Sequence, residues 1–264
     1  MDLLLLILSG AMVGFAVGLT GVGGGSLMTP ILLLFNYPAA IAIGTDLLFA
    51  AITKSSGMFF HHRHGHVDWR TTALLAAGSI PVSIFINLVI IDPSIQEDEN
   101  FAAFLTSFLG VMLILTALVM IFNRYIRFRQ SNVEKLEHQA YYVFLRKHRA
   151  ILVLILGIVL GICVTLSSVG AGAFGAAILF MLFPSWPARH VVGTDIAHAV
   201  PLTLVAGLGY LFNGLVDFSL LLALIVGSLP GIYFGTKLGS VLPEALLRTV
   251  LIIALLVLGI NFSL

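Results

Sequence analysis

The chain contains about ten apolar segments separated by more polar stretches, and these segments restrict its possible folds more than any other feature. Because 59% of the residues are hydrophobic and only 9% are charged, a soluble domain could not bury them, whereas lipid can surround them. The segments do not alternate between polar and apolar residues, so they predict membrane helices and not barrel strands. They lie at about 3–19, 27–36, 39–60, 71–91, 101–123, 150–169, 174–183, 188–212, 218–238 and 246–264.

Two of these segments, 27–36 and 174–183, are too short to cross a bilayer. A spanning helix needs about 20 residues at about 1.5 Å each. Each short segment follows a glycine-rich break, and we expect both to be half-helices that end within the membrane, an arrangement found in secondary transporters.

The second half of the chain repeats the first at a constant offset of 149 residues. The triplet GTD at 44–46 recurs at 193–195, and GSIP at 78–81 recurs as GSLP at 227–230. Matched glycine, proline and aspartate are harder to obtain by chance than matched leucine or alanine. The same offset pairs Gly21, Gly23, Pro38, Gly65, Val67 and Asp68 with Gly170, Gly172, Pro187, Gly214, Val216 and Asp217. We therefore expect two related halves of about five segments each.

The distribution of lysine and arginine predicts how the halves are oriented. The segment 124–149 carries seven basic residues, which is typical of a cytoplasmic loop, and the basic turn at 61–70 must lie on the same side. The acidic turn at 92–100 and the turn at 213–217, which has no lysine or arginine, then lie outside. Since 65–68 lies inside and its repeat outside, the halves are predicted to be inverted.

This reading divides the chain into three parts. A first transmembrane repeat occupies 1–123, a cytoplasmic basic loop occupies 124–149, and a second, inverted transmembrane repeat occupies 150–264. The expected fold is all-α and polytopic, with one half-helix in each repeat and both termini extracytoplasmic, in the cell (inner) membrane.

The glycine-rich breaks TGVGGGS at 20–26 and SSVGAGAFG at 167–175 are candidate anion sites. Glycine lets a ligand approach the backbone amides closely, and the beginning of the following helix offers free N–H groups and a partial positive charge. The alternative is that the glycines only permit close helix packing. The substrate-binding residues predicted here are Thr20, Gly23, Gly24, Gly25, Ser26, Ser168, Gly170 and Gly172.

Asp46 and its repeat Asp195 lie at appreciable membrane depth, where a carboxyl is costly unless it is paired, protonated or facing water. We interpret both as protonatable coupling groups, with His198 sharing a proton three residues after Asp195. The adjacent Thr45 and Thr194 are predicted to contact substrate. A helix cap or an interhelical hydrogen bond is the alternative role for the carboxyls.

Lys54 is a further ionisable residue within an apolar segment. Its long side chain could reach the inner surface of the membrane. If it faces the centre instead, it supplies a fixed positive charge for an anion, and we count it among the substrate-binding residues.

The sequence HHRHGHVD at 61–68 is similar to a metal-binding tract. A solvated rim at the membrane surface is the favoured interpretation, because only its glycine, valine and aspartate recur in the second half. We therefore predict no metal and no cofactor, and the net charge of +1 indicates no nucleic-acid partner.

These features meet in a resemblance. The chain resembles the sulfite exporter TauE/SafE family of membrane permeases over nearly its whole length. Four stretches carry this resemblance, namely GLTGVGGGSLMTPILL, YPAAIAIGTDL, GAGAFG and WPARHVVGTDI. The resemblance implies transport of sulfur-containing anions such as sulfite, sulfonates or sulfoacetate, commonly as export. The second break departs from the first, because Ala173 and Phe174 stand where the first has Gly24 and Gly25.

The predicted function is that of a secondary transporter moving a small, sulfur-containing anion by alternating access. The alternative is a proton-coupled cation or metal transporter that uses Asp46, Asp195, His198 and the histidine tract. An enzyme is not expected, because no nucleophile with a partner base is recognisable. The partners are the small anionic substrate and the lipid bilayer, and the sequence leaves a homodimer open.

Overall fold

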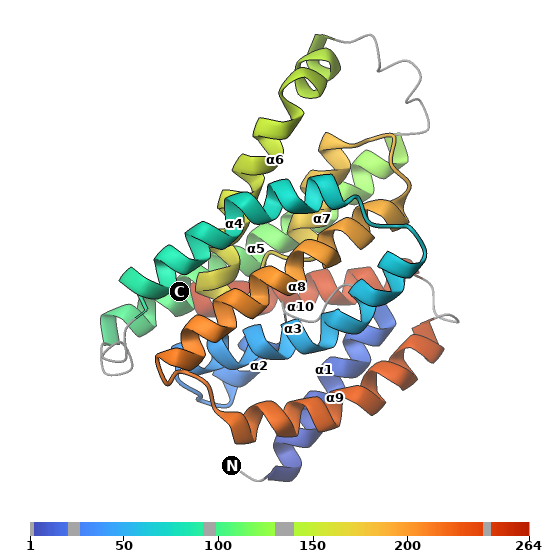
Figure 1. The fold of residues 1–264 in the computed structure, drawn as a ribbon. Coiled ribbons are helices and arrows are strands. Elements are labelled where there is room, and N and C mark those ends of the chain that lie inside the picture. The colour runs from blue at the N-terminus through green and yellow to red at the C-terminus, as the bar shows by residue number, and fades with distance from the viewer. Residues whose placement is uncertain (1–2, 21–26, 92–98, 130–139, 240–243, 264) are drawn as a thin grey trace.

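The chain folds into a bundle of helices of very different lengths (Figure 1). The structure, a computed structural model, describes residues 3–20, 27–91, 99–129, 140–239 and 244–263. The described helices are α1 (Leu3–Thr20), α2 (Met28–Leu34), α3 (Ala39–Arg63), α4 (Trp69–Val89), α5 (Glu99–Arg129), α6 (Ala140–Ser167), α7 (Ala173–Leu182), α8 (Ala188–Phe212), α9 (Phe218–Gly239) and α10 (Glu244–Ser263).

Six of the described helices are long and apolar enough to cross a membrane, namely α3, α4, α8 and α9 and the apolar parts of α5 and α6. α1 and α10 hold shorter apolar stretches, Leu4–Ala16 and Thr249–Ser263. Large apolar side chains face outward, among them Leu88 and Phe212, which are 80% and 84% exposed. An outward apolar surface of this kind requires lipid, so the chain is an all-α, polytopic membrane protein.

The two expected half-helices are present as α2, with 7 residues, and α7, with 10. At 1.5 Å per residue they span only about 10 and 15 Å. Each is followed by a proline, Pro38 or Pro187, that stands immediately before the next long helix and cannot continue the preceding one. The residue that caps the start of α7, Gly172, has φ 133°, a backbone conformation that only glycine adopts readily.

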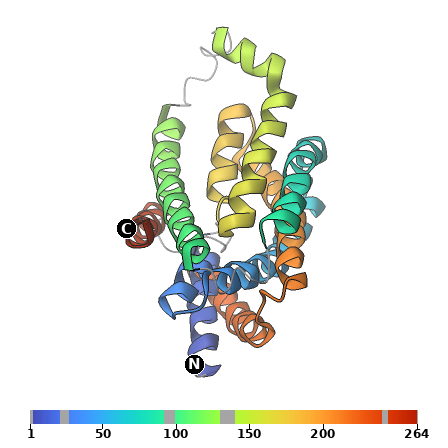
Figure 2. The same ribbon diagram turned by 90° about the vertical axis from the view of Figure 1, so that its left-hand side faces the viewer.

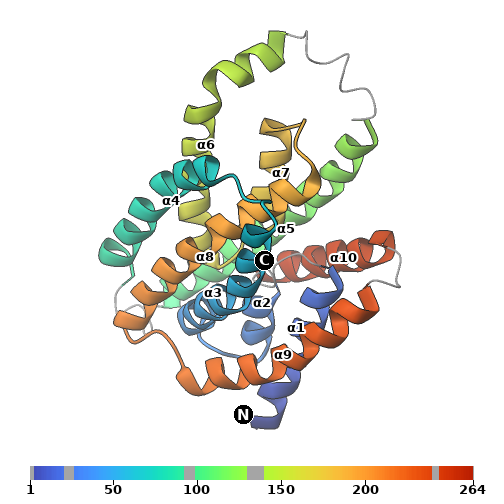
Figure 3. The same cartoon turned by 45° about the vertical axis from the view of Figure 1, so that its right-hand side comes forward.

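The two halves pack through two helix pairs, each with one helix from either half. α1 lies along α9, and α6 lies along α4 (Figures 1 and 3). A Cβ atom added to Gly14 of α1 would lie 2.6 Å from the Cα atom of Ser228, and one added to Gly161 of α6 would lie 2.9 Å from the Cα atom of Ser79. Ser79 and Ser228 are repeat equivalents, so in both helix pairs a glycine packs against the same serine of the repeat.

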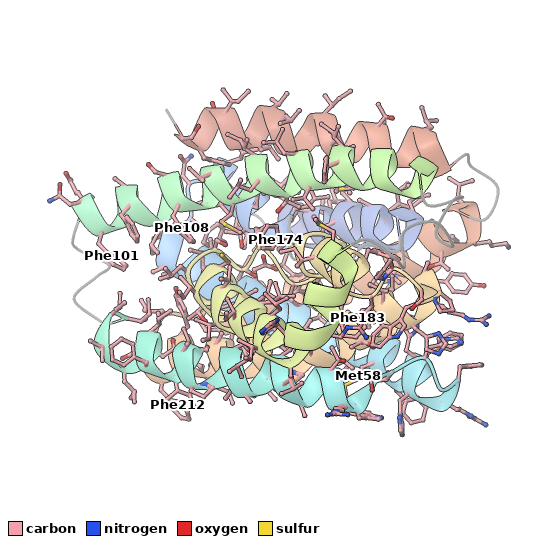
Figure 4. The ribbon with its side chains drawn as sticks, turned by 90° about the horizontal axis from the view of Figure 1, so that it is seen from above. Met58, Phe101, Phe108, Phe174, Phe183 and Phe212 are labelled. Atoms are coloured by element: carbon pink, nitrogen blue, oxygen red, sulfur yellow. The ribbon has the colours of Figure 1, made fainter. Side chains whose placement is uncertain are left out.

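α3 and α8 occupy the middle of the bundle and contact each other directly. Apolar side chains from several other helices close around them, including Phe108 of α5 and Phe174 at the start of α7 (Figure 4). α5 continues to Arg129, and α6 begins at Ala140 and extends at that end beyond its neighbours (Figure 2). Both helices therefore enter the segment that the sequence assigns to a loop.

Candidate functional site

The Asp46 carboxyl lies at the start of a short helix. Asp46 belongs to α3 and is fully buried. Its Oδ2 atom accepts hydrogen bonds from the Thr29 hydroxyl at 2.6 Å and the Thr29 backbone N–H at 3.2 Å. Its Oδ1 atom has no partner among the described residues. Asp46 thus holds the first turn of α2, which immediately precedes α3 in the chain.

Asp195 occupies the corresponding place in the second half. It belongs to α8, is 2% exposed, and interacts favourably with the backbone N–H of Gly172, the residue that caps α7. Its Oδ1 atom lies against Gly175 and is unpartnered within the described part of the chain. A carboxyl at this end of a helix is favoured by the helix dipole.

Lys54 brings a positive charge to the same region. Its side chain is only 6% exposed, and Nζ donates a hydrogen bond of 3.0 Å to the backbone carbonyl of Ala171. Its charge acts on Asp195 and on Asp46. The alternative in which Lys54 reaches the membrane surface is therefore wrong, because the amino group crosses into the second glycine-rich break.

That break is tightly folded. Ser168 and Gly170 have φ 57° and 126°, and the backbone N–H of Gly175 donates to the carbonyl of Gly170 at 2.9 Å. The Ser168 side chain is buried and interacts with the Asp46 carboxyl, but its hydroxyl lacks hydrogen-bond geometry to any described partner. The second break therefore contacts Lys54 and Asp46, two residues of the first half.

His198 lies in the same core, but its described partner is a serine. Its Nε2 atom shares a hydrogen bond of 2.8 Å with the hydroxyl of Ser79 in α4, and its Nδ1 atom is unpartnered within the described ranges. Lys54 also acts on it electrostatically. The expected proton sharing between His198 and Asp195 stays a prediction.

Thr45 and Thr194 each accept a hydrogen bond from the other half. The backbone N–H of Asp68 donates to Thr194 Oγ1 at 3.0 Å, and that of Asp217 donates to Thr45 Oγ1 at 3.3 Å. All four residues are related by the 149-residue offset, so the two bonds are equivalent. The hydroxyls thus hold the beginnings of α4 and α9, while substrate contact by these threonines stays a prediction.

Most of the first glycine-rich break lies outside the described residues. The side chain of Thr20 and the residues Gly23, Gly24, Gly25 and Ser26 lie outside the part that the structure describes. Their predicted contacts with substrate remain predictions.

Three residues of the site escaped the sequence analysis, namely Thr29, Ser79 and Ala171. Ser79 lies in the repeated GSIP sequence, which marked it as part of the repeat but not as a partner of His198. Thr29 and Ala171 lie beside the glycine-rich breaks, but ordinary threonine and alanine carry no signal of their contacts with Asp46 and Lys54.

No group of three or more His, Cys, Asp and Glu side chains in the described ranges is arranged to hold a metal ion. The histidine tract nevertheless gathers several imidazoles, because the rings of His61, His64 and His190 all lie within 5.8 Å of that of His66, measured between ring centroids.

Interrupted helices around buried charged groups define the class of membrane transporters with a central site. The family comparison agrees. The family model described as sulfite exporter TauE/SafE matches residues 6–262, and the chain belongs to this family of membrane transporters.

Relatives share nearly the whole length of the chain. The probable membrane transporter protein YjnA of Bacillus subtilis is 33% identical over 257 residues, covering 97% of this chain and 98% of that protein. YdhB of the same organism, with the same description, is 28% identical over 267 residues, with 97% and 98% covered. The probable membrane transporter protein MJ0441 of Methanocaldococcus jannaschii is 26% identical over 274 residues, with 97% and 93% covered. No solved structure matches the chain.

Proposed function

We propose that the protein is a secondary transporter that moves a small anion across the cell membrane by alternating access. The observation that carries this proposal is the buried Lys54 amino group, which reaches from the first half to the Ala171 carbonyl and interacts electrostatically with Asp195 and Asp46. A buried cation attracts an anion far more strongly than an exposed one, because little water screens its charge.

The charge count links the anion to a proton. With Lys54 protonated and both Asp46 and Asp195 ionised, these three groups carry one net negative charge, which repels an anion. Protonation of one carboxyl removes that charge. Anion binding therefore brings a proton with it, and the two carboxyls are the proposed coupling groups. His198, on which Lys54 also acts, is the third proposed coupling group.

The carboxyls also mark where the anion would bind. The Asp195 carboxyl interacts with the N–H of Gly172 at the beginning of α7, a position that favours a negative group. When Asp195 is protonated its hold on this N–H weakens, and the anion takes its place beside Lys54. Gly170, Ser168 and the first break, with Gly23 to Ser26, complete the proposed pocket.

The helix pairs formed between the halves suggest how the protein moves during transport. Each half contributes one long helix to a pair with the other half, α1 with α9 and α6 with α4. We propose that 1–123 and 150–264 are inverted repeats that rock against each other around the central site. In this scheme the basic segment 124–149 faces the cytoplasm and both termini lie outside.

The family description supports a sulfur-containing anion, with sulfite, a sulfonate or sulfoacetate as the first candidates. Purified protein in proteoliposomes should move one of these anions faster than protein-free vesicles, with accompanying proton movement. No flux of any such oxyanion, together with flux of a divalent metal that Asp46→Asn and Asp195→Asn abolish, would favour the cation transporter instead.

A further inference from the structure

We propose that His61, His66 and His190, with His64 and Arg189 beside them, form a second anion site at the end of α3, where it would bind a small oxyanion such as sulfate before or after its passage through the centre. The part of this proposal that concerns passage of the anion to or from the central site rests on the proposed function, whereas binding of the anion to the histidine cluster does not.

The end of α3 folds back to create this cluster. Gly65 has φ 68°, and the backbone N–H of His66 donates to the carbonyl of His61 at 2.9 Å, a common way to end a helix. The turn sets the His66 ring beside the rings of His61 and His64, with centroids 5.6 and 5.8 Å away. His190 comes from the first turn of α8, with its ring centroid 5.5 Å from that of His66.

Three imidazoles in this cluster each have one ring nitrogen without a hydrogen-bond partner among the described residues. The Nδ1 atoms of His61, His66 and His190 are buried without a hydrogen bond to any described residue. A buried ring nitrogen needs an acceptor for its N–H or a donor for its lone pair. An oxyanion has several acceptor oxygens and can satisfy more than one N–H group at once.

The charges around the cluster select an anion over a metal cation. Burial is the largest cause of a lowered pKa of His66, followed by the nearby Arg189, His190 and His64. Arg189 thus brings a permanent positive charge to the cluster. The beginning of α8 adds to this potential. Asp68, two residues after His66, accepts a hydrogen bond of 2.6 Å at its Oδ2 atom from the Thr71 hydroxyl. The cluster is therefore a poor site for a divalent cation.

The repeat shows that helix packing does not require these imidazoles. Gly193 packs against the His66 carbonyl and the His61 ring, and its equivalent Gly44 packs against the Leu215 carbonyl and the Tyr210 ring. Leu215 and Tyr210 are the repeat equivalents of His66 and His61, and Ile41 is that of His190. The backbone contact recurs at both ends, whereas the imidazoles occur at one.

The test is anion-dependent thermal stabilisation of the purified, full-length Lys54→Met protein, in which the central site is disabled. Sodium sulfate should raise Tm saturably against sodium chloride of equal ionic strength, because a ligand stabilises the state that binds it. In the same background, His66→Leu with His190→Leu should weaken the apparent sulfate affinity by about tenfold or more. His62→Leu is the matched control, because His62 stacks edge-on against Trp69 and not on this cluster.

His66→Gln, which keeps an N–H donor, covers the case in which the double variant does not fold, and should retain part of the sulfate effect. Equal sulfate affinity in the double variant and the control would overturn the proposal, because salt exclusion stabilises all variants alike. So would the absence of saturable stabilisation, or saturable stabilisation by zinc chloride alone. Since Lys54→Met lacks the central site, failure of that site leaves this result unchanged.

Discussion

The Lys54 amino group donates a hydrogen bond of 3.0 Å to the Ala171 carbonyl, 117 residues further along the chain. This contact carries the one charge of Lys54 across the interface between the halves and into the second glycine-rich break. A carbonyl is a weak partner for a buried ammonium group compared with an anion. The bond is thus the natural one for an anion to replace, and the predictions about transport start from it.

Lys54→Met should abolish anion flux while leaving the protein folded. Methionine fills similar space without a charge, so the site keeps its two carboxyls and loses its attraction for an anion. We expect at least about a tenfold loss of flux in proteoliposomes, since one lost charge-assisted contact exceeds 1.4 kcal/mol. Lys54→Arg is the control that keeps the charge. Wild-type flux in Lys54→Met, at equal protein incorporation, would rule out the proposed anchor.

Asp195→Asn should separate anion movement from proton movement. The amide cannot ionise, so the site is neutral with Lys54 protonated, and the anion no longer needs a proton to enter. Anion binding should become less dependent on pH than in the wild type, and proton flux should fall relative to anion flux. Asp46→Asn tests the other carboxyl in the same way. Unchanged proton coupling in both variants would remove these residues from the coupling mechanism.

Gly175→Ala should damage the site through a single methyl group. The added Cβ would collide with Oδ1 of Asp195 and push the carboxyl away from the beginning of α7. Crowding of this kind costs about 1–3 kcal/mol, and transport should fall together with Tm. Gly57→Ala is the control, since its added Cβ would have no neighbour nearer than 3.8 Å. Equal activity in both variants would contradict the tight packing of Asp195 on α7.

Thr45→Val and Thr194→Val should destabilise the protein by similar amounts. Each removes the acceptor of a backbone N–H from the other half, that of Asp217 or Asp68, which costs about 1–3 kcal/mol when the N–H is left unpaired. Unfolding curves of the two variants test the equivalence of the halves. A large difference between the two variants in the loss of unfolding free energy would show that the two equivalent hydrogen bonds do not contribute equally to stability.

Asp217 should make the protein sensitive to acid. Its burial raises its pKa, but hydrogen bonds from the Ser219 hydroxyl and from the backbone N–H groups of Leu220 and Ser219 outweigh this, and the pKa is lowered. A lowered pKa means that the unfolded chain binds the proton more readily. The stabilisation is therefore complete above the unfolded pKa of about 3.9 and is lost as pH falls below it. Asp217→Asn should lose stability at neutral pH and show a shallower fall in Tm on acidification, and an unchanged acid profile would argue against this role.

Much of the fold was predictable from the sequence. The expected segment 174–183 corresponds to α7 at Ala173–Leu182, and 188–212 to α8 at Ala188–Phe212. These bounds follow from local chemistry, because apolar runs form helices in lipid and a proline or glycine ends them. The end of α5 at Arg129 was missed, since a helix can continue into water after its apolar run stops at about residue 123.

The sequence by itself determined which segments form helices and where most of them begin and end, because these depend on residues near one another in the chain. Only the tertiary structure decided that Lys54 points inward to Ala171, that Asp46 bonds to Thr29, and that His190 joins the histidines at the end of α3. Such contacts depend on which faces of distant helices meet, and a buried polar group takes whichever partner that packing brings within reach.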